Sequence, residues 1–235
     1  ANWVRAAEFA DSVGTDIITS SLGYTNFDDV ALSHKYKDMT GKVAISSIAA
    51  TKAAEKGIVV LVAAGNDGDN KWKYIASPGD ADKVITVGGV NYSREHVDFS
   101  SYGPSYDKRI KPDLCAKASY VFVANENNGF TRADGTSFAT PIMAGAVACL
   151  LQANPSKSIA EITEALRKSG DHSHDPNNTY GYGIPDIFIA HSLLNKNPYF
   201  DYSQEKLFSP SLNGFENRIF YRFYSPTAQT VTITV

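Results

Sequence analysis

The sequence has few cysteines, little net charge and no long uninterrupted apolar run. Two cysteines in 235 residues, Cys115 and Cys149, are too few for a disulfide framework or a cysteine-based metal site. A net charge of −3 provides no basic surface for phosphate backbones, so we expect no nucleic-acid partner. Nothing in the chain has the pattern of a signal peptide or a membrane span, so we expect no membrane association.

The composition is that of an ordinary soluble domain with a piece of a second one. Hydrophobic residues make up 43% and charged residues 20% of the chain. Residue 1 is an alanine that opens directly into helical sequence, so we expect the chain to be part of a longer protein. Both cysteines are expected to be inert core thiols, Cys149 on an apolar helix and Cys115 in an apolar bend.

Helical and extended patterns alternate through the first half of the chain. The apolar spacing predicts helices over 3–13 and 43–56, each followed by a glycine, and strands over 16–20, 58–64 and 84–90. The strand at 58–64 is continuously apolar, as in a parallel sheet buried on both faces. The pattern predicts an α/β fold, a three-layer, mostly parallel sheet with helices on both faces. Ligand sites are then expected in the loops at 21–23 and 65–67, beyond the carboxyl ends of two strands.

The last third of the chain changes in character. Ser158 to Glu161 is a capping box that opens a helix to about residue 168, and another helical segment covers 187–194. From residue 196 onward prolines, glycine and aromatics occur without period, and 218–223 and 230–235 alternate like strands. We therefore predict one domain over 1–195, followed over 196–235 by a linker and the first strands of a truncated β domain.

The chain is organised around the segment 135–141, Gly-Thr-Ser-Phe-Ala-Thr-Pro, and the apolar run 142–153 after it. That run predicts a helix buried on all sides and too short to span a membrane. A proline tolerated in the first turn puts Ser137 at the helix N-terminus, where free amides favour negative charge. Small residues around Ser137 leave room for a reactant, which favours a nucleophile over a simple helix cap.

This segment resembles the nucleophile motif of the subtilisin-like serine proteases. The resemblance implies that Ser137 attacks a peptide carbonyl and forms an acyl-enzyme. It extends from about residue 3 to 194, through similar segments at 21–23, 63–66, 76–78, 99–104 and 111–113.

Asn66 follows a buried strand within Ala64-Gly65-Asn66. Gly-Asn-Asp-Gly is also good turn sequence, so a purely structural role is the alternative. The resemblance implies that the Asn66 amide and the backbone N–H of Ser137 form an oxyanion hole, which stabilises the oxygen that becomes negative during attack.

The resemblance also implies a substrate pocket. Its walls would be Ser21, Leu22 and Gly23 on one side and Ala63, Ala64 and Gly65 on the other, with Ala76 as the floor. These small residues would admit a medium to large apolar side chain. Asp67 could attract a basic side chain instead, or be an ordinary turn carboxylate.

No cofactor is expected for the chemistry, but the resemblance implies a weak structural cation site, for calcium or another hard cation. Its ligands would be the backbone oxygens of Gly79, Ala81 and Val84 together with the carboxylate of Asp107.

A serine needs a base, and in this family the order along the chain is Asp, His, Ser. None of the five histidines has the small-residue surroundings of the family histidine, and the aspartate segment is also missing. We therefore expect both residues to lie upstream of Ala1, the sheet to be incomplete on its N-terminal side, and this chain alone to be inactive. Its partners would be a polypeptide substrate and the missing N-terminal segment, and its location secreted or cell-surface.

Two other functions can be built from the sequence. An α/β-hydrolase would use Ser137, Asp175 and His191 in that order, although residues 130–134 before the serine are mixed and polar. A non-catalytic module would instead bind a peptide strand along the sheet edge at 21–23.

Overall fold

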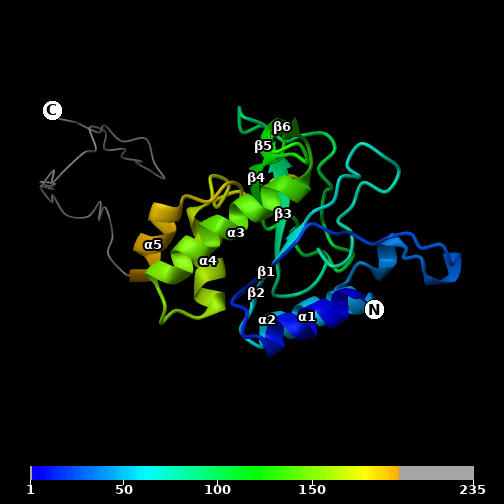
Figure 1. Ribbon diagram of the computed structural model, residues 1–235, viewed down its shortest axis with the longest axis horizontal. Coiled ribbons are helices and arrows are strands. Elements are labelled where there is room, and N and C mark those ends of the chain that lie inside the picture. The colour runs from blue at the N-terminus through cyan, green and yellow to red at the C-terminus, as the bar shows by residue number, and fades with distance from the viewer. Residues whose placement is uncertain (1, 196–235) are drawn as a thin grey trace, which may run out of the picture. The chain divides into compact units, whose positions relative to one another are not determined.

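The computed structural model describes residues 2–195, shown in colour in Figure 1. The chain separates into two units, Ala1–Tyr199 and Phe200–Val235, and every described residue belongs to the first. The predicted linker and β-strands over 196–235 lie outside the described residues, so the truncated β domain stays a prediction.

Four parallel strands form the central sheet, in the order β1-β2-β3-β4. They are β1 (Ile17–Ser20), β2 (Val59–Ala63), β3 (Ile85–Val90) and β4 (Leu114–Lys117). In the register Ser20 lies opposite Val62, so the carboxyl ends of β1 and β2 are neighbours. The loops that follow these two strands therefore start side by side.

Helices cover both faces of the sheet, which confirms the three-layer prediction (Figure 1). Val60 and Val62 of β2 pack with α1 (Asn2–Ser12) and α2 (Ile45–Glu55). The alternate residues Val59 and Leu61 pack on the other face with α3 (Thr136–Ala153), α4 (Ile159–Ser169) and α5 (Ile187–Asn195). All five residues of β2 are buried, as its continuous apolar sequence predicted.

Most predicted elements lie within two residues of the observed ones. Gly14 and Gly57 follow α1 and α2 with φ of 75° and 100°, a conformation that glycine adopts without strain. Ser158 caps α4 through its hydroxyl, and Glu161 completes the capping box. The loop left unassigned at 24–39 contains two short 3₁₀ helices, η1 (Val30–Leu32) and η2 (Tyr36–Asp38).

Three strands were not predicted. β4 is the fourth strand of the sheet, and β5 (Val121–Ala124) and β6 (Phe130–Ala133) form a separate antiparallel hairpin. Cys115 is buried as expected, but it lies in β4 and not in a bend.

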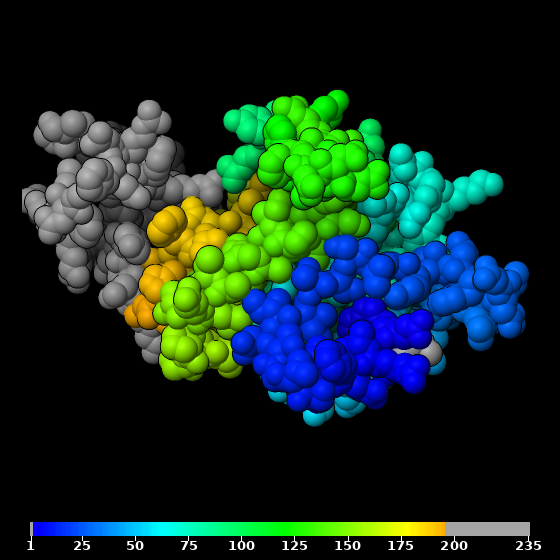
Figure 2. All heavy atoms as spheres, in the orientation of Figure 1, coloured from blue at the N-terminus to red at the C-terminus, as the bar shows by residue number. Residues whose placement is uncertain are grey.

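The prediction that α3 is buried on all sides is wrong. Its stripe of exposed residues follows helical spacing and includes Ile142, with 46% of its surface exposed, Gly145, Ala148 and Cys149. Figure 2 shows this yellow-green part of the chain uncovered on the face toward the viewer. Cys149 is therefore an exposed thiol and not a core residue.

α3 is also longer than the twelve-residue run that was judged too short to span a membrane. With 18 residues it is long and apolar enough to cross a membrane, the one such helix between residues 2 and 195. The length of α3 alone therefore does not exclude a membrane span. In the structure α3 lies against all four strands of the sheet, and its buried side chains, Met143 and Val147 among them, belong to the core.

Candidate active site

Ser137 is the second residue of α3, close to where the sequence predicted the helix to begin. Gly135 is the N-cap residue with φ of 148°, and its N–H donates to the carbonyl of Ala118 on the segment after β4 (2.8 Å). A Cβ at Gly135 would lie 3.3 Å from Nδ2 of Asn66. Glycine thus lets the chain turn into α3 while the Asn66 amide stays close.

Hydrogen bonds from Thr136 fix the orientation of the Asn66 amide. The backbone N–H and the hydroxyl of Thr136 both donate to Asn66 Oδ1, each over 2.9 Å. An N–H can bond only to an oxygen here, so Oδ1 must face Thr136 and Nδ2 must point away from it. The structure thus leaves the Asn66 NH₂ group as a hydrogen-bond donor near Gly135, at the start of α3.

Pro141 lies inside α3, beyond the first turn, and removes one helical hydrogen bond. The carbonyl that would accept from residue 141 is that of Ser137, four residues earlier. The Ser21 hydroxyl donates to this carbonyl over 2.8 Å. The loop after β1 thereby holds the backbone of Ser137, a contact that the sequence analysis missed although Pro141 indicated a carbonyl in need of a partner.

The three segments predicted to line a substrate pocket meet in the structure. A Cβ on Gly23 would lie 3.2 Å from the Cβ of Ala76, and the N–H of Ala76 points to the carbonyl of Ala64 at 3.5 Å. Ala63, Ala64 and Ala76 are buried, whereas Leu22 is 53% exposed. Of these segments, the one at 21–23 contacts Ser137 through the Ser21 hydroxyl, and the pocket itself stays a prediction.

Asp67 is partly exposed and organises its own loop. Its Oδ1 accepts from the Asn70 amide (2.6 Å), and its N–H donates to the Ser101 hydroxyl (3.1 Å). These contacts fit a turn carboxylate, and a role of Asp67 in specificity stays a prediction.

The oxygens expected to hold a structural cation already have protein donors. Arg109 donates to the carbonyl of Ala81 (3.1 Å), and Lys111 to that of Val84 (3.3 Å). The Thr86 hydroxyl donates to the carbonyl of Gly79 (2.6 Å). Asp107 pairs with Arg109 over 2.9 Å. Two protein cations, Arg109 and Lys111, thus bond to oxygens that were predicted to hold a metal, and the metal site stays a prediction.

Lys111 is itself held in the core by a carboxylate. Burial lowers the pKa of its ammonium, and the attraction of Asp113, 2.7 Å away, acts in the opposite direction. Burial alone would raise the pKa of Asp113, but Lys111 and Arg167 lower it. The pair fixes Lys111 Nζ beside the Val84 carbonyl.

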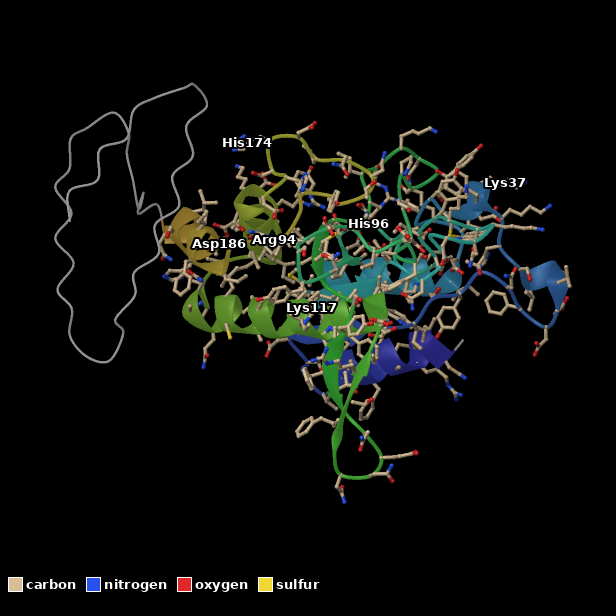
Figure 3. The ribbon with its side chains drawn as sticks, turned by 90° about the horizontal axis from the view of Figure 1, so that it is seen from above. Lys37, Arg94, His96, Lys117, His174 and Asp186 are labelled. Atoms are coloured by element: carbon tan, nitrogen blue, oxygen red, sulfur yellow. The ribbon has the colours of Figure 1, made fainter. Side chains whose placement is uncertain are left out.

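Four of the five histidines have contacts that do not include Ser137. His34 packs on Phe27, His96 and His172 pack on Tyr180, and the His191 ring bonds to Asn154. His174 lies on the loop after α4 (Figure 3). Nothing among these contacts supplies a base for Ser137.

The α/β-hydrolase arrangement of Ser137, Asp175 and His191 is not formed. Asn154, which binds the His191 ring, is the C-cap of α3, whereas Ser137 is at its N-terminus. Seventeen residues at 1.5 Å each separate these positions by about 25 Å. The strand before the serine, β6, belongs to an exposed hairpin and not to the central sheet.

Comparison with known sequences gives one family. The sequence profile of the subtilase family matches residues 2–183. Serine protease AprX of Bacillus subtilis (strain 168) is 34% identical, over 72% of this chain and 41% of its own length. Subtilisin DY of Bacillus licheniformis is 30% identical, over 80% of this chain and 61% of its own length. The chain therefore spans about half the length of these two relatives.

Solved structures share the fold. The prenylagaramide maturation protease PagA superposes with a TM-score of 0.64 and 28% identity, covering 81% of this chain and 66% of that protein. The self-cleaved protease domain of PatA gives a TM-score of 0.65 at 24% identity, covering 82% and 67%, and supports the fold alone.

Proposed function

The chain belongs to the subtilase family, and on this premise we propose that it carries the nucleophile half of a serine endopeptidase. Ser137 attacks the carbonyl of a polypeptide substrate and becomes acylated, and the amide of Asn66 and the N–H of Ser137 bind the oxyanion. By the same family resemblance the protein acts as a secreted or cell-surface enzyme.

The observation that carries this proposal is the orientation of Asn66. A turn asparagine could point in any direction, but here Thr136 holds its Oδ1 with two donors of 2.9 Å each. The remaining NH₂ group therefore points away from Thr136, which supports its role as an oxyanion donor. Donors that are fixed before the reaction stabilise developing charge most effectively, because no energy is spent in turning them.

The base and its carboxylate partner come from a segment outside residues 1–235. The described histidines with assigned contacts bind elsewhere, and the chain covers only 41% and 61% of two relatives. The exposed apolar stripe of α3 begins one turn beyond Ser137 and offers this segment a surface to cover. We propose that a segment packed on Ile142, Gly145 and Ala148 supplies the base, and that the chain alone is inactive.

Mixing experiments test the proposal. The chain is mixed, under folding conditions, with a polypeptide carrying the upstream part of the same protein, and hydrolysis of an unstructured protein is followed. We expect hydrolysis and fluorophosphonate labelling only in the mixture, and neither with Ser137→Ala. A mixture that associates but shows no hydrolysis and no labelling of Ser137 contradicts the proposal.

One observation favours the peptide-binding alternative. Within residues 2–195, β1 is an edge strand, and Ser21 and Leu22 after it are exposed, so a peptide could add along this edge. The same labelling experiment separates the two functions. Peptide binding by the mixture without fluorophosphonate labelling would favour the module.

A further inference from the structure

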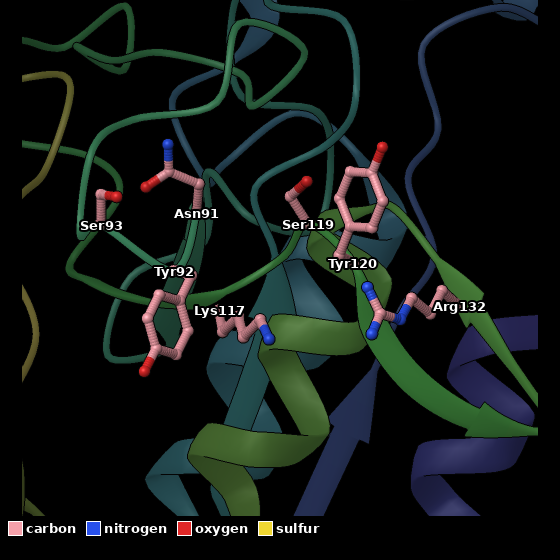
Figure 4. A pocket seen from close by; sticks show the side chains of 7 residues that line it. All are labelled: Asn91, Tyr92, Ser93, Lys117, Ser119, Tyr120 and Arg132. Carbon is pink, nitrogen blue, oxygen red and sulfur yellow. The ribbon is translucent and has the colours of Figure 1, made fainter.

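A pocket whose lining does not include Ser137 or Asn66 lies beside the segments that lead into α3. A pocket of about 560 Å³ opens beyond the carboxyl ends of β3 and β4. Its volume is within the usual range of small-ligand sites, about 300–1,000 Å³. The lining residues are Asn91, Tyr92, Ser93, Lys117, Ser119, Tyr120 and Arg132 (Figure 4).

Every lining side chain of this pocket can donate a hydrogen bond, and none is a carboxylate. Four are hydroxyls, one is an amide, and two are cations, Lys117 from β4 and Arg132 from β6. Figure 4 shows both cationic groups turned toward the space between them. A pocket built of donors and two positive charges selects a ligand with negatively charged oxygens.

Neither cation is neutralised by an ion pair among residues 2–195. Lys117 lies over the ring of Tyr92 at 5.6 Å, and Arg132 over the rings of Phe122 at 4.8 Å and Tyr120 at 5.8 Å. Ring faces hold a cation in place without cancelling its charge, so both groups can still bind an anion.

Two carboxylates close in sequence to the lining residues, Asp134 and Glu95, accept hydrogen bonds from residues of the pocket. Asp134 accepts from the N–H of Tyr120 (2.6 Å), and Glu95 accepts from the amide of Asn91 (2.9 Å). They help to shape the rim of the pocket, and these contacts do not bring them onto Lys117 or Arg132.

The rim suits a polypeptide better than a free ion. Tyr92 is 88% exposed and Tyr120 is 62% exposed, and Phe122 and Phe130 on the hairpin are exposed as well. Such rings offer apolar contacts to a chain that places acidic side chains in the pocket, whereas an inorganic anion would use none of them.

The pocket is also built on the segments that position Ser137. Lys117 and Ser119 flank Ala118, whose carbonyl accepts the N–H of Gly135, and Arg132 is three residues before Gly135. A ligand here lies near the proposed nucleophile without occupying its site.

We propose that this pocket is a binding site for an acidic segment of the polypeptide substrate, held by Lys117 and Arg132 through its carboxylates. As a substrate site it rests on the proposed function, but the binding itself requires no catalysis. Arg132 offers the planar donors that match a carboxylate, and Lys117 adds a point charge beside it.

The test measures binding without hydrolysis. The ¹⁵N-labelled chain is titrated with a blocked Glu-Gly-Glu-Gly peptide, with its Gln-Gly-Gln-Gly counterpart and with inorganic phosphate, and amide shifts near residues 117–120 are followed. We expect the glutamate peptide to shift these amides, with weaker binding at higher salt. Arg132→Gln and Lys117→Gln should each weaken binding about tenfold, as for loss of one hydrogen bond to a charged group.

Lys37→Gln is the matched control, since Lys37 is an exposed lysine well apart from Lys117 in Figure 3. It should leave binding unchanged, as should Ser137→Ala, which separates this site from the proposed catalysis. Amide shifts outside the pocket show that each variant is folded. Equal binding of the glutamine peptide, binding of phosphate alone, or no shifts with any ligand would each overturn the proposal.

Discussion

Thr136 and Asn66 show how one residue fixes the orientation of another. Thr136 uses its backbone and its side chain to hold a single amide oxygen, which leaves the Asn66 NH₂ group free. In the reconstituted protein, Asn66→Ala should lower kcat by about 10²–10³, the range known for loss of such a donor in subtilisin itself. Steady-state hydrolysis checks this, and KM should change little.

Thr136→Val is the companion variant, because it removes the hydroxyl bond to Asn66 and keeps the backbone bond. Its loss of kcat should be smaller than that of Asn66→Ala. An Asn66→Ala chain with unchanged kcat would remove the amide from the mechanism.

Ser21 and Pro141 act on the same carbonyl, that of Ser137, and this makes them testable as a pair. Ser21→Ala should lower the free energy of unfolding by about 0.5–1 kcal/mol, because it removes one partly solvated hydrogen bond. Pro141→Ala restores the helical N–H to that carbonyl, so Ser21→Ala in this background should cost close to nothing. Urea unfolding of the four chains measures the coupling, and equal costs in both backgrounds would contradict it.

His96 makes stability depend on pH. It is half-buried, stacks on Tyr102, and has no partner at Nε2 among the described residues. Burial lowers its pKa below the ordinary 6.5, and Asp98 and Ser100 only partly oppose this. The unfolded chain therefore binds the proton more tightly. The contribution of His96 is complete above pH 6.5 and is lost as pH falls through the folded pKa.

His96→Phe keeps the stacking surface and cannot titrate. Between pH 7 and 5 its unfolding free energy should fall less than that of the unchanged chain, and NMR of the His96 ring should give a pKa below 6.5. A ring that titrates above 6.5 would reverse the expected slope.

At the scale of elements, the segment before β4 supplies side-chain donors to the oxygens that were predicted to hold a cation. Arg109 joins Asp107 to the carbonyls of Asp80 and Ala81, over 2.9, 2.7 and 3.1 Å. We expect EDTA to leave the unfolding midpoint unchanged, since these oxygens already have donors. Arg109→Gln should cost about 1–3 kcal/mol, because it leaves carbonyls without partners and Asp107 without its cation. Calorimetry with and without EDTA measures the unfolding midpoint. A midpoint that EDTA lowers in the unchanged chain would support the predicted metal site.

The elements with a strong local sequence signal were the predictable ones. β2 and α4 follow directly from an apolar run and from the Ser158 capping box. The hairpin β5–β6 was missed because one face carries exposed Phe122 and Phe130, so no alternation of apolar and polar residues marks it. β4 was missed because four residues that include Cys115 and Lys117 are too short to show a period.

For the candidate site, the sequence predicted which segments lie together but not the contacts between them. Asn66 and Ser137 could be placed at one edge because strand ends and helix starts gather there in an α/β sheet. What the sequence could not supply is contact between distant segments, such as Ser21 with the Ser137 carbonyl or Arg109 with Ala81. The error about α3 has the same origin, since an apolar helix does not reveal which side of it the remaining chain covers.

At the scale of the whole molecule, the exposed stripe of α3 gives a direct test of whether the proposed upstream segment covers this helix. Cys149 lies on the stripe and is exposed, whereas burial in β4 raises the pKa of the Cys115 thiol. With a maleimide at neutral pH, the native chain should react once, at Cys149, because only an accessible thiol can form the thiolate. When the upstream polypeptide binds, the rate of Cys149 labelling should fall as the rate of hydrolysis rises.

Ala148→Asp separates coverage of α3 from other effects. Ala148 is exposed, so the new carboxylate costs the free chain little, but it would be buried under a partner packed on the stripe. This variant should fold, keep Cys149 reactive in the mixture, and give no hydrolysis; Lys37→Gln, away from the stripe, should behave like the unchanged chain. Hydrolysis that appears while Cys149 still reacts at its original rate would show that the base reaches Ser137 without covering α3.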